Sequence, residues 1–288
     1  MLIIENINLV ITSKSNSLIK RFRSFKDKSP SKDEDCFCIE GTNLIQELIN
    51  SRIQPFKVIA TEAWLKKNSL LTEKINSSLI TKVSHEVLST SITTKTPDGV
   101  AALIKISSIP KFIYEKKDDF ILVLDRVQDP GNLGNLFRTA LAAGVNKILL
   151  GGGANPLNQK VLRSSCGSVF HLPYKRLIGE EDKVIHDLLS CLKELDRNGF
   201  QIVSTGSKDK FPQRTSKPYW ELNWSKPTAL VLGNEGCGIH HKIVDAFDET
   251  ITIPHSELVE SLNVASVAVP LLLERKRIAL TSISRKKK

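Results

Sequence analysis

The chain has 288 residues, of which 41% are hydrophobic and 25% are charged. This composition is typical of a folded globular protein and excludes an intrinsically disordered one, and a chain of this length accommodates about two domains. The 41 basic and 31 acidic residues give a net charge of +10, which favours a polyanion such as RNA as a partner.

The positive charge is concentrated at the two ends of the chain. Residues 1–110 hold 15 basic and 11 acidic residues, residues 111–270 hold 19 of each, and residues 271–288 hold seven basic and one acidic. Within the first part, Asp27 is the one acidic residue in a basic cluster at 14–32. A solvated helix face is one interpretation of this cluster. The other is RNA contact, in which each neutralised phosphate releases counterions. We predict that four residues of the cluster contact RNA: Lys20, Arg21, Arg23 and Lys26.

Membrane insertion and secretion are not indicated. No apolar stretch approaches the roughly 20 residues that span a bilayer. The N-terminal segment MLIIENINLV has no basic region before it and no cleavage site after it. The five cysteines include Cys36 and Cys38, but no second pair follows at zinc spacing. We therefore predict reduced thiols, no metal and a cytoplasmic protein.

Short apolar runs alternate with amphipathic stretches, which predicts an α/β fold with a mostly parallel sheet. In the first part of the chain we predict helices over 17–25 and 42–49 and strands over 36–39, 56–60, 79–83 and 100–106. In the second part, strands are predicted at 120–124, 147–150, 201–204, 229–232 and 250–253, with helices between them. Pro110 and the charged run EKKDD predict a linker between the two parts. The expected division is an N-terminal domain (1–107), a linker (108–119), a second domain (120–280) and a basic tail (281–288).

The first candidate site is the segment LDRVQDPGNLGNLFRTALAAG at 124–144. Pro130 and Gly131 predict a sharp turn, and Asn132 is expected to cap the helix that follows. On that helix, Asn132 and Arg138 fall on a polar arc, near the carboxyl end of a strand, where ligands bind in open α/β sheets. A polar outer face on a sheet-covering helix is the alternative. The opposite arc is apolar and consists of Leu133, Leu136, Phe137, Ala140 and Leu141.

The second and third candidate sites also follow predicted strands. In LVLGNEGCGI at 230–239, three glycines (233, 236 and 238) allow positive φ and close approach of a ligand, and Glu235 is the one charge. In residues 251–274, Ser261, Leu262 and Asn263 open a helix that is apolar almost all round, which predicts burial in a core or a subunit interface. Ser261 is a candidate cap of this helix, and Pro270 would kink it unless it ends early.

Together, the three segments resemble the three sequence motifs of the SpoU (TrmH) branch of the SPOUT RNA methyltransferases. The matching pieces are Asn132 to Arg138 within DPGNLGNLFRTA, GNEG at 233–236, and IP at 253–254 with ESLNV at 260–264. Residues 155–174 resemble the family's linking segment. The segments ITSKSNSLIKRFRSF, FCIEGTNLIQELI and TPDGVAALI resemble its N-terminal substrate-binding domain, which is related in fold to RNA-binding ribosomal proteins of the large subunit.

The resemblance implies transfer of a methyl group from S-adenosylmethionine to a ribose 2′-hydroxyl of RNA. It also implies a homodimer, and a trefoil knot in the parallel-sheet methyltransferase domain at 120–280. Arg138 would lie at the reacting ribose. The implied donor-binding residues are Gly233, Ile253 and Leu262, with Thr205 and Gly206 beside them. The remaining polar site residues are Asn132, Glu235, Ser261 and Asn263. His255 departs from the family pattern, because an apolar residue usually follows IP.

Several alternatives stay open. A guanidinium stays protonated above pH 12, which favours a phosphate-holding and charge-stabilising role for Arg138 over that of a deprotonated base. The N-terminal domain favours 23S-type ribosomal RNA as substrate, with tRNA as the alternative. A non-catalytic RNA-binding or ribosome-assembly protein on the same scaffold is the second class. A nicotinamide-dependent oxidoreductase is disfavoured, because no G-x-G-x-x-G follows a strand.

Overall fold

The computed structural model describes residues 10–25, 35–206 and 216–286, the last five in backbone only. The chain forms two compact units: Met1–Ile109 with Pro156–His171, and Pro110–Asn155 with Leu172–Lys288. Within the described ranges, no helix is long and apolar enough to cross a membrane. All five cysteines are free, and no three His, Cys, Asp or Glu side chains of the described residues gather as a metal ion would require.

The first unit is built on a mixed four-stranded sheet. Its strands are Cys36–Glu40 (β1), Lys57–Ala60 (β2), Ile80–Lys82 (β3) and Val100–Lys105 (β4), in the order β1-β4-β2-β3. β4 is antiparallel to β1 and β2, and β2 is parallel to β3. The helices are Ser17–Ser24 (α1), Thr42–Asn50 (α2), Glu62–Lys67 (α3), Ser69–Thr72 (α4), His85–Ser91 (α5) and Gln159–Ser164 (α7). Ile19 and Phe22 of α1 pack with Val87 and Leu88 of α5 in its core.

The second unit is built on a seven-stranded parallel sheet. Its strands are Phe120–Asp125 (β5), Lys147–Gly151 (β6), Tyr174–Leu177 (β7), Gln201–Thr205 (β8), Lys217–Pro218 (β9), Thr228–Leu232 (β10) and Thr250–Thr252 (β11). They lie in the order β7-β6-β5-β10-β8-β11-β9, and every neighbouring pair is parallel. The expected α/β fold with a mostly parallel sheet is confirmed for this unit.

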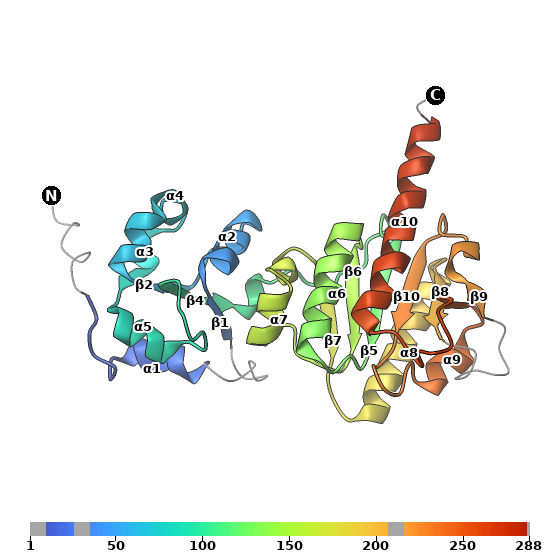
Figure 1. The fold of residues 1–288 in the computed structure, drawn as a ribbon, viewed down its shortest axis with the longest axis horizontal. Helices are drawn as coiled ribbons and strands as arrows, with labels where there is room; N and C mark the ends of the chain where they lie inside the picture. The colour runs from blue at the N-terminus through green and yellow to red at the C-terminus, as the bar shows by residue number, and fades with distance from the viewer. Residues whose placement is uncertain (1–9, 26–34, 207–215, 287–288) are drawn as a thin grey trace. The chain divides into compact units, whose positions relative to one another are not determined.

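Helices cover both faces of this sheet. Helices Glu181–Arg197 (α8) and His241–Ala246 (α9) pack with Ile121 and Val123 of β5 in one core. Residues of a strand alternate between the two faces, so Leu122 and Leu124 point to the opposite face. Helices Pro130–Ala143 (α6) and Val264–Lys286 (α10) lie side by side, and the second half of α10 extends beyond the sheet (Figure 1).

The carboxyl ends of the parallel strands meet at one edge of the sheet. β5, β10, β8 and β11 are consecutive neighbours there, although they come from widely separated parts of the chain. The loops that leave them begin near residues 126, 233, 206 and 253. These are the loops that carry the three sequence motifs and Thr205-Gly206, so the topology brings the motifs to one place.

Several expectations about local structure are corrected. The side chain of Asp129 caps α6 by accepting the N–H of Asn132 at 2.8 Å, so Asn132 lies in the first turn and is not the cap. Leu141, expected in the apolar arc of α6, is exposed, whereas Ala143 is buried. Helix α10 continues through Pro270 and does not end there.

The expected linker and the expected second domain differ in part from the packing. Asp118, within the expected linker at 108–119, is buried and forms an ion pair with Lys147 at 2.5 Å. Residues 156–171, which fall inside the second domain expected at 120–280, pack with the first unit. The assignment of the first domain to RNA binding and of the second to methyl transfer stays a prediction.

Candidate functional site

A hydrogen-bond network connects the three motif segments. Glu235, on the loop after β10, accepts the side-chain N–H of Asn132 at 3.0 Å through Oε1. Its two oxygens also accept the backbone N–H groups of Gln128 at 3.3 Å and Asp129 at 3.4 Å. The Oδ1 atom of Asn132 in turn accepts the side-chain N–H of Asn263 at 2.9 Å. Three of the predicted polar site residues therefore form one chain of contacts.

Asn263 also determines where the last helix begins. Its Oδ1 atom accepts the backbone N–H groups of Ala265 at 2.9 Å and Ser266 at 3.2 Å, which makes Asn263 the cap of α10. The cap is thus Asn263 and not the alternative candidate Ser261, two residues earlier. Because one amide group both caps α10 and contacts Asn132, the start of α10 is held against the first turn of α6.

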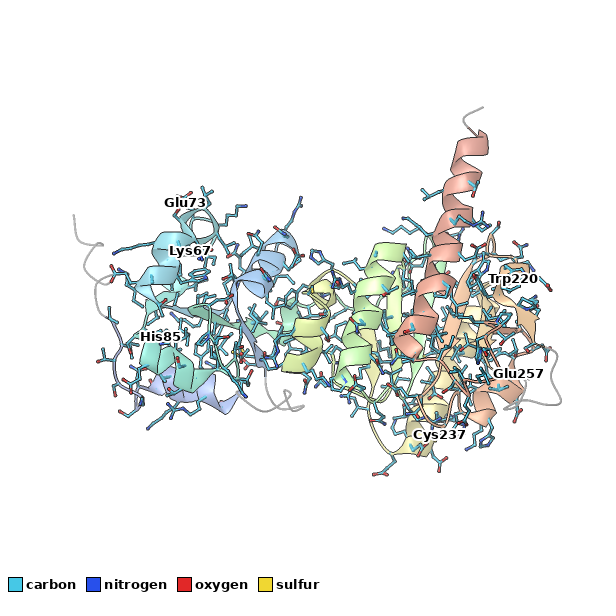
Figure 2. All side chains as sticks on the ribbon, in the orientation of Figure 1. Lys67, Glu73, His85, Trp220, Cys237 and Glu257 are labelled. Carbon is cyan, nitrogen blue, oxygen red and sulfur yellow. The ribbon has the colours of Figure 1, made fainter. Side chains whose placement is uncertain are left out.

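A cleft opens between the loops that follow β8, β10 and β11. It encloses about 790 Å³ of space, open solvent included. The five predicted donor-binding residues all line it: Thr205, Gly206, Gly233, Ile253 and Leu262. Glu235 and Ser261 line it as well, so the cleft adjoins the polar network. Figure 2 labels Cys237 and Glu257, which mark the loops after β10 and β11.

Main-chain groups shape the floor of the cleft. The hydroxyl of Thr205 donates to the carbonyl of Val231 at 3.1 Å, and the N–H of Gly206 donates to the carbonyl of Ile251 at 3.1 Å. At Gly233, an added Cβ would lie 2.3 Å from backbone atoms of Gly238 and Ile239, so two backbone segments cross in direct contact. Gly238 has a φ of +72°, as expected, whereas Gly233 and Gly236 do not have positive φ. Gly233 is therefore required for the close approach.

Arg138 lies apart from the cleft lining. It is exposed on α6, on the polar arc expected from the sequence. Within the described part of the chain, Arg138 forms neither an ion pair nor a hydrogen bond, so its guanidinium is free to meet a ligand. His255, which departs from the family pattern, is exposed, and its Nδ1 atom is 2.7 Å from the carbonyl oxygen of Ile253.

Two charged residues next to the site gave no motif signal. Asp125 ends β5 and is fully buried, and Arg126 follows it with a φ of +55°, a conformation rare for residues other than glycine. Burial disfavours the charged form of Arg126, but the carboxylates of Asp125 and Glu181 outweigh burial and raise its pKa. Burial, followed by the charges of His241 and Arg126, lowers the pKa of His240.

The predicted RNA-binding residues of the first unit lie on the exposed side of α1. Lys20 is exposed, as are Arg21 and Arg23, whereas Ile19 and Phe22 face the core. Arg21 lies 3.6 Å from the carboxylate of Asp35 and stacks over Phe56 with its guanidinium 5.2 Å from the ring centre. Lys26 lies outside the described residues.

The fold and the site define a class of protein. An open parallel sheet has a small-molecule cleft at the carboxyl ends of its strands, with a polar network beside it, as in enzymes that bind a nucleotide-like ligand there. The model of the SpoU rRNA methylase family matches residues 119–273, more than half of the chain, and the model of the MRM3-like substrate binding domain matches residues 16–102. The chain therefore belongs to the SpoU rRNA methylase family.

Individual relatives agree with this assignment. The 23S rRNA (guanosine(2553)-2′-O)-methyltransferase RlmP of Bacillus subtilis is 31% identical over 264 residues, which cover 91% of this chain and 97% of RlmP. An uncharacterised tRNA/rRNA methyltransferase of Synechocystis is 32% identical over 93% of both chains.

Solved structures are similar as well. An AdoMet-bound rRNA methyltransferase from Sinorhizobium meliloti has a TM-score of 0.76 at 26% identity and covers 93% of this chain and 97% of that one. A structure of an RNA 2′-O ribose methyltransferase has a TM-score of 0.75 at 28% identity and covers 94% and 100%. The prediction of an S-adenosylmethionine-dependent RNA ribose 2′-O-methyltransferase is confirmed.

Proposed function

We propose that the protein methylates a ribose 2′-hydroxyl of 23S-type ribosomal RNA, with the donor in the cleft after β8, β10 and β11. The observation that carries the proposal is the contact chain from Glu235 through Asn132 to Asn263, which joins all three motif segments beside that cleft. Ribosomal RNA is the preferred substrate because RlmP acts on 23S rRNA and matches this chain over nearly its whole length.

The residues that line the cleft fit S-adenosylmethionine in their chemistry. Its floor includes the backbone at Gly206 and Gly233, and its walls include the apolar side chains of Ile253 and Leu262. Backbone polar groups suit an adenine edge, and aliphatic walls suit its faces. When bound, the donor supplies an activated methyl group on a positively charged sulfur.

The protein's contribution to the reaction is mainly positioning. Aligning a nucleophile with its target contributes up to about 7–11 kcal/mol to catalysis. In this proposal Asn132, Glu235, Ser261 and Asn263 define the wall against which the ribose is aligned. Arg138, on the exposed face of α6, holds a backbone phosphate of the RNA and stabilises charge that develops on the attacking oxygen. A deprotonated Arg138 acting as base is the competing version.

RNA capture is assigned to the first unit. The exposed basic residues of α1 form a positive surface on the domain that matches a substrate-binding family. Replacing Lys20, Arg21, Arg23 and Lys26 by alanine is expected to weaken RNA binding and to flatten its dependence on salt concentration. An RNA-binding titration at several salt concentrations measures this slope, and an unchanged slope would exclude these residues from the RNA interface.

A homodimer and a knot complete the proposal. Val269, Leu273 and Leu280 are exposed apolar residues of α10, which is the kind of surface that a second copy covers. After β11 the chain passes back beyond β8 and β10, because α10 packs on α6 and Arg275 contacts Asp119 at 2.8 Å, just before β5. This return of the chain end supports the trefoil knot that the family resemblance implies. Sedimentation of the wild type beside Leu273→Glu tests the dimer, and a monomeric wild type would refute it.

Methyl transfer from labelled S-adenosylmethionine to separate rRNA and tRNA pools tests the substrate. We expect label in 23S-type rRNA. Label confined to tRNA would replace the proposed substrate with the alternative one. Donor binding without transfer to naked RNA or to ribosomal particles would favour the non-catalytic assembly protein.

A further inference from the structure

The loop at residues 233–240, which borders the donor cleft, is attached to the end of β5 and to the start of α6. One fastening is the contact of Glu235 with Asn132 described above. The other is formed by Asp125 and Arg126, neither of which lines the cleft. This second attachment has no role in the proposed reaction, although it involves a fully buried carboxylate and an arginine in an uncommon backbone conformation.

The side chain of Asp125 holds the far end of the loop. Its Oδ2 atom accepts the backbone N–H of His240 at 2.7 Å, and the same carboxylate accepts Nε and Nη2 of Arg126 at 3.0 and 3.2 Å. Both oxygens of the buried carboxylate are therefore used, and the guanidinium balances its charge. A buried charge is tolerated only with such partners.

The backbone of Arg126 holds the near end of the loop. Its carbonyl accepts the side-chain N–H of Asn234 at 2.9 Å, and its own N–H donates to the carbonyl of Gly151 at 3.0 Å. The Oδ1 atom of Asn234 then accepts the N–H groups of Gly236 and Cys237 at 2.9 and 3.0 Å. The shape of the loop from 234 to 237 thus depends on where the Arg126 carbonyl lies.

The left-handed conformation of Arg126 is what allows both attachments. With φ at +55°, its carbonyl reaches Asn234 while its side chain folds back onto Asp125 and reaches Glu181 of α8 at 2.5 Å. Such a conformation costs energy for a residue with a Cβ and persists only when the surrounding contacts maintain it. The ion pairs of the side chain are those contacts.

We propose that Asp125 and Arg126 are positioning residues, which hold the loop 233–240 in the conformation that binds the methyl donor. The inference rests on the proposed donor site. Gly233, Asn234, Glu235, Gly238 and Ile239 all border the cleft and lie on the loop, so a loop that is released at Asp125 and Arg126 loses the preformed wall of the site.

The test measures donor affinity in Arg126→Ala and Asp125→Asn by isothermal titration with S-adenosylmethionine, and the steady-state constants with RNA. We expect the dissociation constant and the KM for S-adenosylmethionine to rise at least 10-fold, with the KM for RNA within twofold of the wild type. Arg126→Lys, which retains one ion pair with Asp125, is expected to recover part of the affinity. A role in stability alone would lower the melting temperature without changing the KM for the donor.

Lys183→Ala is the matched control, because it removes an exposed ion pair with Asp187 on α8 without touching the loop. It should bind the donor like the wild type. If Arg126→Ala does not fold, Asp125→Asn, which conserves side-chain size, serves for the same measurement. Wild-type donor affinity in folded Asp125→Asn would overturn this inference. A wild type that binds no donor would instead overturn the proposed function.

Discussion

Replacing Gly233 by alanine tests whether the donor cleft depends on the contact between two backbone segments. A Cβ at this position would lie 2.3 Å from the carbonyl carbon of Gly238 and 2.3 Å from the nitrogen of Ile239. Ordinary van der Waals contact begins at 3.4 Å, so one of the segments has to move by about 1.1 Å. Neither neighbour is a flexible side chain that could turn away.

The size of the effect follows from this displacement. Forcing an extra methyl group into a packed site costs about 1–3 kcal/mol. Because Gly233, Gly238 and Ile239 all line the cleft, the displaced loop has to return against this strain when the donor binds. At about 1.4 kcal/mol for each factor of ten, the dissociation constant for S-adenosylmethionine should rise about 5- to 150-fold.

Gly236→Ala is the control, because it lies on the same loop. A Cβ there would be 3.5 Å from Oδ1 of Asn234, which is an ordinary contact, and its φ is not in the left-handed region. Isothermal titration of both variants with S-adenosylmethionine, after circular dichroism has established that they fold, measures the difference. We expect Gly236→Ala to match the wild type. A folded Gly233→Ala that binds the donor within twofold of the wild type would refute the reasoning.

Three further predictions concern single residues. Arg138→Lys should lower kcat about 100- to 1,000-fold with donor affinity unchanged, because lysine lacks the forked hydrogen-bond donors of the guanidinium group. Steady-state kinetics and titration with S-adenosylmethionine check this prediction, and loss of donor binding would contradict it. Glu235→Ala leaves the Asn132 side-chain N–H without its acceptor. A hydrogen bond to a charged group contributes roughly 1.5–3 kcal/mol, so turnover should fall about 10- to 150-fold. Unchanged turnover would remove Glu235 from the site. The third concerns His240, whose pKa is lowered by burial and by His241 and Arg126, and whose Nδ1 accepts the N–H of Lys242. Its pKa in the folded state lies below the unfolded value of about 6.5, so the free energy of unfolding should fall as pH is lowered from 7 through 6.5 toward the folded pKa. His240→Asn should remove that part of the fall in urea denaturation at pH 7.5 and 5.5, and an equal fall in both proteins would contradict this assignment.

Hydrophobic patterning predicts much of the fold. The apolar run at 120–124 and those near 147, 201 and 229 are buried strands of the parallel sheet, because a strand covered on both faces is apolar throughout. β7 and β9 were not predicted. β7 is polar at Lys175 and Arg176, and β9 has two residues, one of them Pro218, as is common at a sheet edge.

The candidate site was predictable where a residue type carries the information. Glycine at 233, the amides at 132 and 263 and the carboxylate at 235 all lie at the cleft or in the network beside it. The roles of Asp125 and Arg126 could not be predicted, because they depend on a positive φ at a residue that is not glycine and on contacts with a loop more than 100 positions away. The cap of α6 was misplaced because Asp129 and Asn132 are both good capping residues.

The central claim is that the methyl group goes to a ribose oxygen of ribosomal RNA. Alkaline hydrolysis of rRNA that the enzyme has labelled from S-adenosylmethionine tests this directly, since cleavage needs a free 2′-hydroxyl at the cleaved residue. We predict that the label elutes with alkali-resistant dinucleotides, and that Arg138→Lys leaves almost none there. Label in mononucleotides would place the methyl group on a base and would contradict the account.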